Sequence, residues 1–143
     1  MPENLIAKAT ISINASQTAV WDAFVNPEII KQYMFGTKVI SDWTEGGSIV
    51  WKGQWQDKSY EDKGTILKFE PESLLEYSHF SPLSGKPDRP ENYHTVTIEL
   101  SGNDSQTEVI LSQDNNPTEE SQKHSAENWQ VMLDGLKKLL ENS

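Results

Sequence analysis

Residues 116–142 read NPTEESQKHSAENWQVMLDGLKKLLEN, and large apolar side chains recur in this segment every three or four positions. That spacing predicts one amphipathic helix with a buried face and a solvent-exposed face. Asn116 suits the N-cap, Pro117 the first helical position, and Glu119 follows three residues after the cap. A helix of about 25 residues is roughly 38 Å long, so it must cross the whole domain. The expected buried stripe consists of Ala126, Trp129, Met132, Leu133, Leu136, Leu139 and Leu140.

The chain before this helix predicts mainly strands. Residues 5–13 alternate between apolar and polar side chains, which is the period of a strand with one buried face. Ser16 and Asn26-Pro27 then mark the starts of two short helices, at residues 17–24 and from residue 28 to about residue 34. Six further strands, separated by turn residues, are expected at 38–43, 48–55, 59–70, 74–80, 93–101 and 107–114.

This order of elements indicates the fold class. One strand, two short helices, six strands and a long helix contain no β-α-β alternation, so a parallel sheet is disfavoured and an α+β architecture is expected. A sheet of this size twists and curls, and its concave face can grip a helix that has a single apolar stripe. We therefore expect residues 1–143 to form a single domain, in which a curved seven-stranded antiparallel sheet wraps around the long C-terminal helix.

Composition restricts the function classes. The 143 residues carry a formal net charge of −10, which repels nucleic acid and anionic membrane surfaces. The absence of cysteine excludes disulfides, thiolate metal sites and a cysteine nucleophile. No signal peptide is recognisable, and no apolar run approaches the roughly 18 residues of a membrane span. These features favour a cytoplasmic protein, either a monomer or a homodimer.

Several short motifs occur along the chain in a characteristic order. They are Ile13-Asn14-Ala15-Ser16 running into Ala19 to Phe24, Asn26-Pro27-Glu28, Asp42-Trp43 with Glu45-Gly46-Gly47, Gly64 to Leu67, Leu74 to Ser78, and Trp129 with Leu133 and Leu136. In these motifs the chain resembles the SRPBCC or START-like helix-grip superfamily, and within it the branch named after the activator of heat-shock-protein-90 ATPase. The resemblance implies the helix-grip fold. Because the superfamily includes lipid carriers, hormone receptors, cyclases and co-chaperones, it also implies ligand binding, a chaperone partner or a stress response.

A helix laid over a concave sheet can enclose a cavity lined by inward-facing side chains. Strand parity places His94 on the face of Val96 and Gln113 on the face of Leu111, each near a rim. His79 has the parity of Tyr77, and the following hairpin brings it close to residue 93 or 94. The ligand-binding residues expected from this reasoning are Trp51, Trp55, Tyr77, His79, His94, Gln113, Trp129, Met132, Leu133 and Leu136.

The paired histidines allow more than one interpretation. Two imidazoles at a cavity mouth can act as a general base or as metal ligands. A stable metal site needs three or four ligands, however, and His79 and His94 are the only candidates. We therefore favour hydrogen-bonded structural histidines and assign no catalytic residue, metal or cofactor. His124 falls away from the apolar stripe and is expected to face solvent.

Other residues have a functional and a structural interpretation. Trp51 and Trp55 share a strand face and either form aromatic walls for a flat apolar ligand or simply fill the core. Gly135 costs a helix about 0.8–1 kcal/mol relative to alanine, which close approach to the sheet or to a ligand would explain. Adjacent acids such as Glu61-Asp62 are expected to be solvated rather than a catalytic pair.

These observations support three hypotheses of function. The first is a non-enzymatic protein that binds a small hydrophobic or amphipathic ligand between the sheet and the C-terminal helix. The alternative is a co-chaperone-like protein that acts through its outer surface, with a heat-shock-protein-90 homologue as partner. The third is an enzyme of the cyclase or hydrolase type that uses His79 or His94, although the chain has none of the common catalytic or phosphate-binding motifs.

Overall fold

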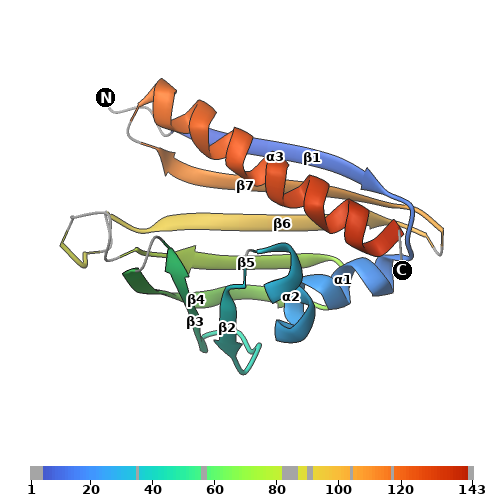
Figure 1. Cartoon of the computed structure of the whole chain (residues 1–143), viewed down its shortest axis with the longest axis horizontal. Coiled ribbons are helices and arrows are strands. Elements are labelled where there is room, and N and C mark those ends of the chain that lie inside the picture. The colour runs from blue at the N-terminus through green and yellow to red at the C-terminus, as the bar shows by residue number, and fades with distance from the viewer. Residues whose placement is uncertain are drawn as a thin grey trace.

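The computed structural model describes residues 5–34, 36–55, 58–81, 87–89, 92–103, 105–116 and 118–141, without the side chains of residues 54, 55 and 58. In chain order its elements are β1 (Leu5–Ile13), α1 (Gln17–Val25), α2 (Pro27–Tyr33), β2 (Lys38–Ser41), β3 (Ser48–Trp55), β4 (Lys58–Glu70), β5 (Leu74–His79), β6 (His94–Gly102), β7 (Thr107–Asn116) and α3 (Glu119–Glu141). The described strands form one seven-stranded sheet in the order β1-β7-β6-β5-β4-β3-β2, and every neighbouring pair is antiparallel. The helix α3 runs diagonally across this sheet. The short helices α1 and α2 lie near the C-terminal end of α3 (Figure 1). The expected α+β helix-grip fold is confirmed.

The first third of the chain folds as its local signals predict. Ala7, Ala9 and Ile13 of β1 are buried, which confirms the alternating pattern. The Ser16 side chain caps α1 by accepting a hydrogen bond of 3.1 Å from the backbone N–H of Ala19. The Asn26 side chain caps α2 in the same way, with an accepted hydrogen bond of 3.0 Å from Glu28 N–H.

The N-terminus of α3 differs from the prediction. Asn116 is the last residue of β7, where it pairs with Leu5, and it is not the N-cap. Thr118 takes that role, because its hydroxyl accepts a hydrogen bond of 3.0 Å from Ser121 N–H. The buried Asn116 side chain instead donates to the Leu5 carbonyl at 2.9 Å and accepts from the Ser125 hydroxyl at 3.0 Å. It therefore ties β1, β7 and α3 together; Pro117 lies outside the described residues.

The apolar stripe of α3 is buried to different depths along the helix. Met132, Leu133 and Leu136 are buried in the core, and Trp129 is only partly buried. Burying each large side chain completely is worth about 1.5–3 kcal/mol, so the middle of α3 is the main anchor of the helix. His124 is exposed, as expected. None of the helices in the described part of the chain is long and apolar enough to span a membrane.

The predicted strand at residues 38–43 is shorter in the structure. β2 ends at Ser41, because Trp43 adopts a positive φ of 57° that a strand cannot continue. The Ser41 hydroxyl accepts a hydrogen bond of 3.0 Å from Trp43 N–H and stabilises this turn. The turn directs Trp43 back towards the core, against which it packs.

Two glycines have opposite packing environments. A β-carbon on Gly64 of β4 would overlap the backbone carbonyl oxygen of Ser78 in β5, so only glycine allows the two strands to approach this closely. On α3, the nearest neighbour of a β-carbon on Gly135 would be the Tyr33 β-carbon of α2, at an ordinary 3.9 Å. Gly135 therefore faces α2, and the expectation of unusually close packing against the sheet is wrong.

These environments predict opposite effects of the same substitution. Gly64→Ala should lower the free energy of unfolding by about 1–3 kcal/mol, because the backbone of β5 must shift. Gly135→Ala should raise it by about 0.8–1 kcal/mol, because alanine is the better helix former and space is available. Urea denaturation of both variants measures the two changes. Equal stability of Gly64→Ala and the parent protein would contradict the close approach of β4 and β5 at Gly64.

Candidate functional site

The described residues surround three adjoining cavities between the sheet, α2 and α3. We call them the apolar end, of about 20 Å³, the polar chamber, of about 80 Å³, and the outer cleft, of about 340 Å³. Met34, at the end of α2, and Trp129 of α3 line all three. The three cavities therefore adjoin around these two side chains, and we call them together the pocket. Its deep end, the apolar end, is almost filled by side chains, and its mouth, the outer cleft, is the most open part.

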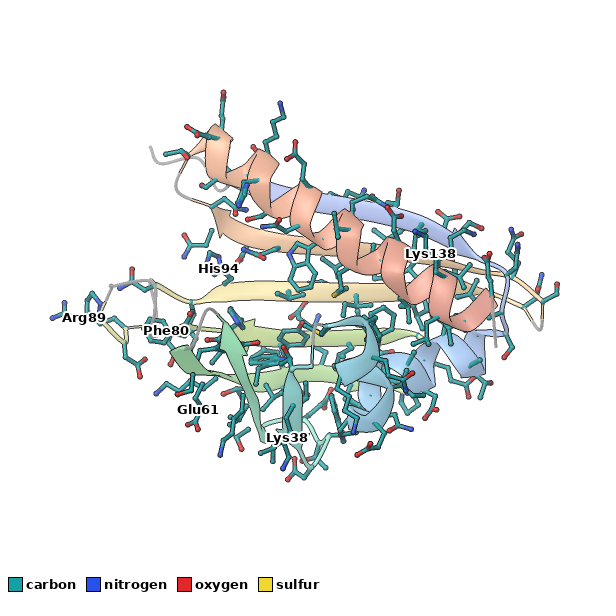
Figure 2. The ribbon with its side chains drawn as sticks, in the orientation of Figure 1. Lys38, Glu61, Phe80, Arg89, His94 and Lys138 are labelled. Carbon is teal, nitrogen blue, oxygen red and sulfur yellow. The ribbon has the colours of Figure 1, made fainter. Side chains whose placement is uncertain are left out.

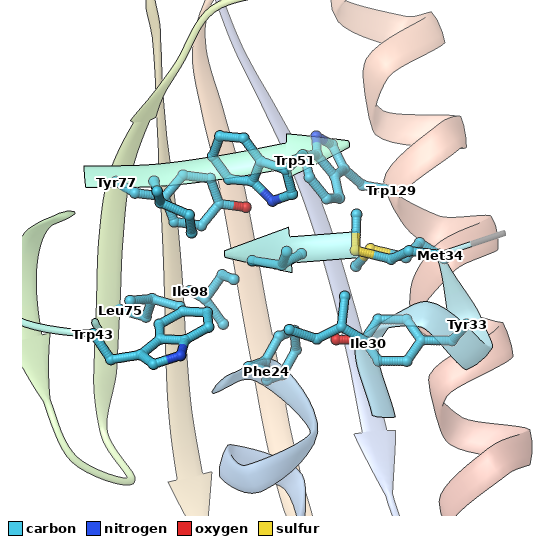
Figure 3. A pocket seen from close by; sticks show the side chains of 13 residues that line it. Phe24, Ile30, Tyr33, Met34, Trp43, Trp51, Leu75, Tyr77, Ile98 and Trp129 are labelled. Atoms are coloured by element: carbon cyan, nitrogen blue, oxygen red, sulfur yellow. The ribbon is translucent and has the colours of Figure 1, made fainter. Parts of the chain in front are cut away.

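The apolar end is lined by aromatic and aliphatic side chains from the sheet and the helices (Figure 3). The rings of Trp51 and Tyr77 lie 5.1 Å apart between their centroids. The Tyr33 hydroxyl donates a hydrogen bond of 2.6 Å to the Ala23 carbonyl oxygen. Burial raises the pKa of both Tyr33 and Tyr77 well above the ordinary value of 10.0. Both phenols are therefore uncharged at neutral pH.

The polar chamber contains an Asp–His pair. Asp62 of β4 lies opposite Trp51 of β3, and His79 of β5 lies opposite His94 of β6. The Nε2 atom of His79 is 3.0 Å from Oδ2 of Asp62, and its ring centroid is 4.9 Å from that of Trp51. The other carboxylate oxygen, Oδ1 of Asp62, is buried and has no hydrogen-bond partner among the described residues.

A pair of hydroxyl groups lies where the polar chamber joins the outer cleft. The Thr37 hydroxyl and the Tyr60 hydroxyl are 2.6 Å apart, and both residues line the two cavities. Tyr60 pairs with Gly53 of β3, and a β-carbon on Gly53 would lie only 2.6 Å from Cζ of the Tyr60 ring. Glycine at position 53 therefore makes the space into which the Tyr60 side chain folds.

Polar side chains of β7 and α3 form the rim of the outer cleft. The indole N–H of Trp129 donates a hydrogen bond of 2.7 Å to Oε1 of Gln113, so the two residues hold each other in place. Ser125 and Asn128 of α3 line the same cleft. A ligand in the outer cleft would meet amide and hydroxyl groups at the rim, and aromatic rings deeper inside.

The structure brings together most of the residues expected at the site. Trp51, Tyr77, His79, Gln113, Trp129 and Met132 line the pocket. Leu133 and Leu136 are completely buried in the hydrophobic core. The side chain of Trp55 lies outside the described residues. The site residues as a set remain a prediction, since binding itself is untested.

His94 lies beside the pocket and has a structural partner. It is found at the end of the sheet near Phe80, away from Lys138 on α3 (Figure 2). Its ring centroid is 6.5 Å from that of His79, as the hairpin led us to expect, and its Nδ1 is 2.9 Å from the Asp114 carbonyl oxygen. No cluster of three or more potential metal ligands occurs among the described residues.

Sequence reasoning missed several pocket residues, and Asp62 is the most informative. Glu61 is exposed as expected, but Asp62 is largely buried and bonded to His79, so its assignment to solvent was wrong. Strand parity was the available signal, because Asp62 shares a face with the buried Ile66. The other missed residues of the polar chamber and the outer cleft are Met34, Thr37, Tyr60, Val96, Ser125 and Asn128.

Comparison with known families agrees with this architecture. The family described as "Activator of Hsp90 ATPase homolog 1-like protein" matches residues 14–141. The chain belongs to this family. The AHSA1-family assignment confirms the resemblance seen in the motifs. Comparison with curated proteins found no match.

Solved structures include a similar protein at high identity. The solution structure of ChR145 from Cytophaga hutchinsonii is 63% identical, with a TM-score of 0.88, over 99% of this chain and 97% of that chain. The Aha1 dimer from Colwellia psychrerythraea is 20% identical, with a TM-score of 0.73, over 95% and 96% of the two chains. CalU16 from Micromonospora echinospora is 22% identical, with a TM-score of 0.69, over 94% and 82%. The last two similarities show the fold alone.

The buried phenols predict a specific loss of stability in alkali. As the pH rises above about 10, the unfolded chain loses the Tyr77 proton while the folded chain keeps it. Each such phenol then lowers the free energy of unfolding by about 1.4 kcal/mol per pH unit. Tyr77→Phe should therefore reduce the slope of stability against pH by about 1.4 kcal/mol per unit between about pH 10.5 and 11.5.

Urea denaturation at a series of pH values measures this slope. At pH 7 both proteins keep all their phenolic protons, so their difference there reports only the lost hydroxyl. An identical alkaline slope in Tyr77→Phe and the parent protein would show that the Tyr77 phenol is not protected by burial.

Proposed function

We propose that this AHSA1-family protein binds a small hydrophobic or amphipathic molecule between the sheet and α3, without catalysing a reaction on it. The observation that carries the proposal is the pair of adjoining cavities, the outer cleft and the polar chamber, which have Trp129 and Met34 as common walls. Its mouth is large enough for a small organic molecule, and its walls are mostly aromatic and aliphatic.

The division of the pocket supports an amphipathic ligand over a purely apolar one. The apolar end is nearly filled by protein side chains, so a ligand cannot be buried there without rearrangement. The usable space is in the polar chamber and the outer cleft, which contain hydroxyl, carboxylate and amide groups as well as indole rings. A molecule with a flat apolar body and one polar group matches this distribution.

Titration with 2-naphthol, followed by ¹⁵N–¹H NMR, tests the binding site. The indole N–H signals of Trp51 and Trp129 should shift together, since both rings line the polar chamber. Asn128→Trp should weaken binding at least about ten-fold, because the larger side chain fills the outer cleft. The matched control is Glu127→Trp on the exposed face of the same helix, which should bind 2-naphthol normally. Shifts scattered over the surface, or equal weakening by both variants, would contradict the proposal.

The family assignment favours a second candidate function. Its description refers to the activation of Hsp90 ATPase, and a dimer of the similarly folded Aha1 is known. If this chain acts in the same way, it should raise the ATPase rate of the Hsp90 homologue of its own host and associate with it in a pull-down. An unchanged ATPase rate at saturating protein, together with no association, would remove this candidate. Light scattering would show whether the chain is a monomer or a homodimer.

A further inference from the structure

The carboxylate of Asp62 is less hydrogen-bonded than its burial requires. Its Oδ2 atom is paired with Nε2 of His79 at 3.0 Å. Its Oδ1 atom is buried and has no partner among the residues that the structure describes. A carboxylate has about four lone-pair sites, so Asp62 keeps most of its accepting capacity unused. Buried acceptors are normally satisfied, which makes this atom a sign of a missing donor.

The polar chamber is the cavity beside the Asp62 side chain. Asp62 lines this chamber together with His79, Thr37 and Tyr60. The Thr37–Tyr60 bond of 2.6 Å uses one of the two hydroxyl protons, so one O–H remains to donate to a ligand oxygen. The chamber therefore offers an acceptor at Asp62 and a donor at the hydroxyl pair.

A hydroxyl group matches the hydrogen-bonding chemistry of both partners. It donates its proton to Asp62 and accepts from Thr37 or Tyr60, whereas a hydrocarbon leaves both unsatisfied. A carboxylate ligand has no proton to donate at neutral pH and would meet the charge of Asp62 as well as the net charge of −10. The apolar body of the ligand would then lie between Trp51, Trp129 and Met34.

The geometry points to an uncharged aromatic alcohol or phenol as the ligand class, with its hydroxyl donating to Asp62 in the polar chamber. This inference rests on the proposed binding function and adds the identity of the recognised group. The volume of about 80 Å³ admits the hydroxyl end of such a molecule, and the outer cleft of about 340 Å³ receives the remainder.

Three probes with the same ring system test the inference: 2-naphthol, naphthalene and 2-naphthoate. We expect 2-naphthol to bind about ten-fold more tightly than naphthalene, because a hydrogen bond to a buried charged acceptor is among the stronger ones. 2-Naphthoate should bind more weakly than either. Dissociation constants come from NMR or tryptophan-fluorescence titrations of the full chain.

Substitution of the acceptor supplies the second test. Asp62→Leu keeps the branched shape of the side chain and removes its oxygens, so the preference for 2-naphthol over naphthalene should disappear. The matched control is Glu61→Leu, the adjacent residue, whose exposed carboxylate lies 3.4 Å from Lys52 and outside the pocket. This variant should keep the ten-fold preference. An NMR spectrum of each variant verifies its fold, and the ranking of the probes on the parent protein stands without either variant.

The outcomes separate this inference from the proposed function. If 2-naphthol shifts the pocket signals but naphthalene or 2-naphthoate binds as tightly, the assignment of a donor to Asp62 is overturned while ligand binding stands. The assignment to Asp62 is also overturned, while ligand binding stands, if Asp62→Leu still binds 2-naphthol more tightly than naphthalene. If none of the three probes shifts the signals of Trp51 and Trp129, both the inference and the proposed function are overturned.

Discussion

The packing of the α3 stripe against the sheet is the contact on which the other features depend. Leu133 and Leu136 are completely buried and hold the middle of the helix on the sheet. Nearer the N-terminus of α3, Trp129 of the stripe and the polar Ser125 line the outer cleft, so here the helix lies over a cavity instead of a solid core. One helix therefore serves as an anchor in its middle and as the wall of a pocket nearer its start.

The polar chamber is more polar than the apolar end because different strands contribute to each part. Leu75 and Ile98, in the centre of the sheet, line the apolar end. The strand pair β3–β4 contributes Tyr60 and Asp62 beside Trp51, and Gly53 leaves the space that Tyr60 needs. This arrangement keeps aromatic walls and hydrogen-bonding groups within one small volume, which suits recognition of a single polar group on an apolar body.

Much of the fold follows from short-range patterns. Alternation in β1 and the caps at Ser16 and Asn26 identify their elements correctly, because these signals depend on neighbours a few residues away. Prediction was wrong at Asn116, where the same residue type suits a helix cap and a buried strand end. Pairing with Leu5, more than a hundred residues away in sequence, keeps Asn116 in the strand.

The sequence alone determines which elements form and which face of each element is buried, since periods of two and 3.6 residues are written into the order of side chains. This extends to the site, where the parity of β4 separates the exposed Glu61 from the largely buried Asp62. Only the tertiary structure decides that Asp62 meets His79, because that contact joins β4 to β5 and no local pattern encodes which residues of two separate strands lie side by side. The same is true of the size of the pocket. Cavity volume depends on how side chains from four or more elements fit together to within an ångström, and that fit exists only after folding.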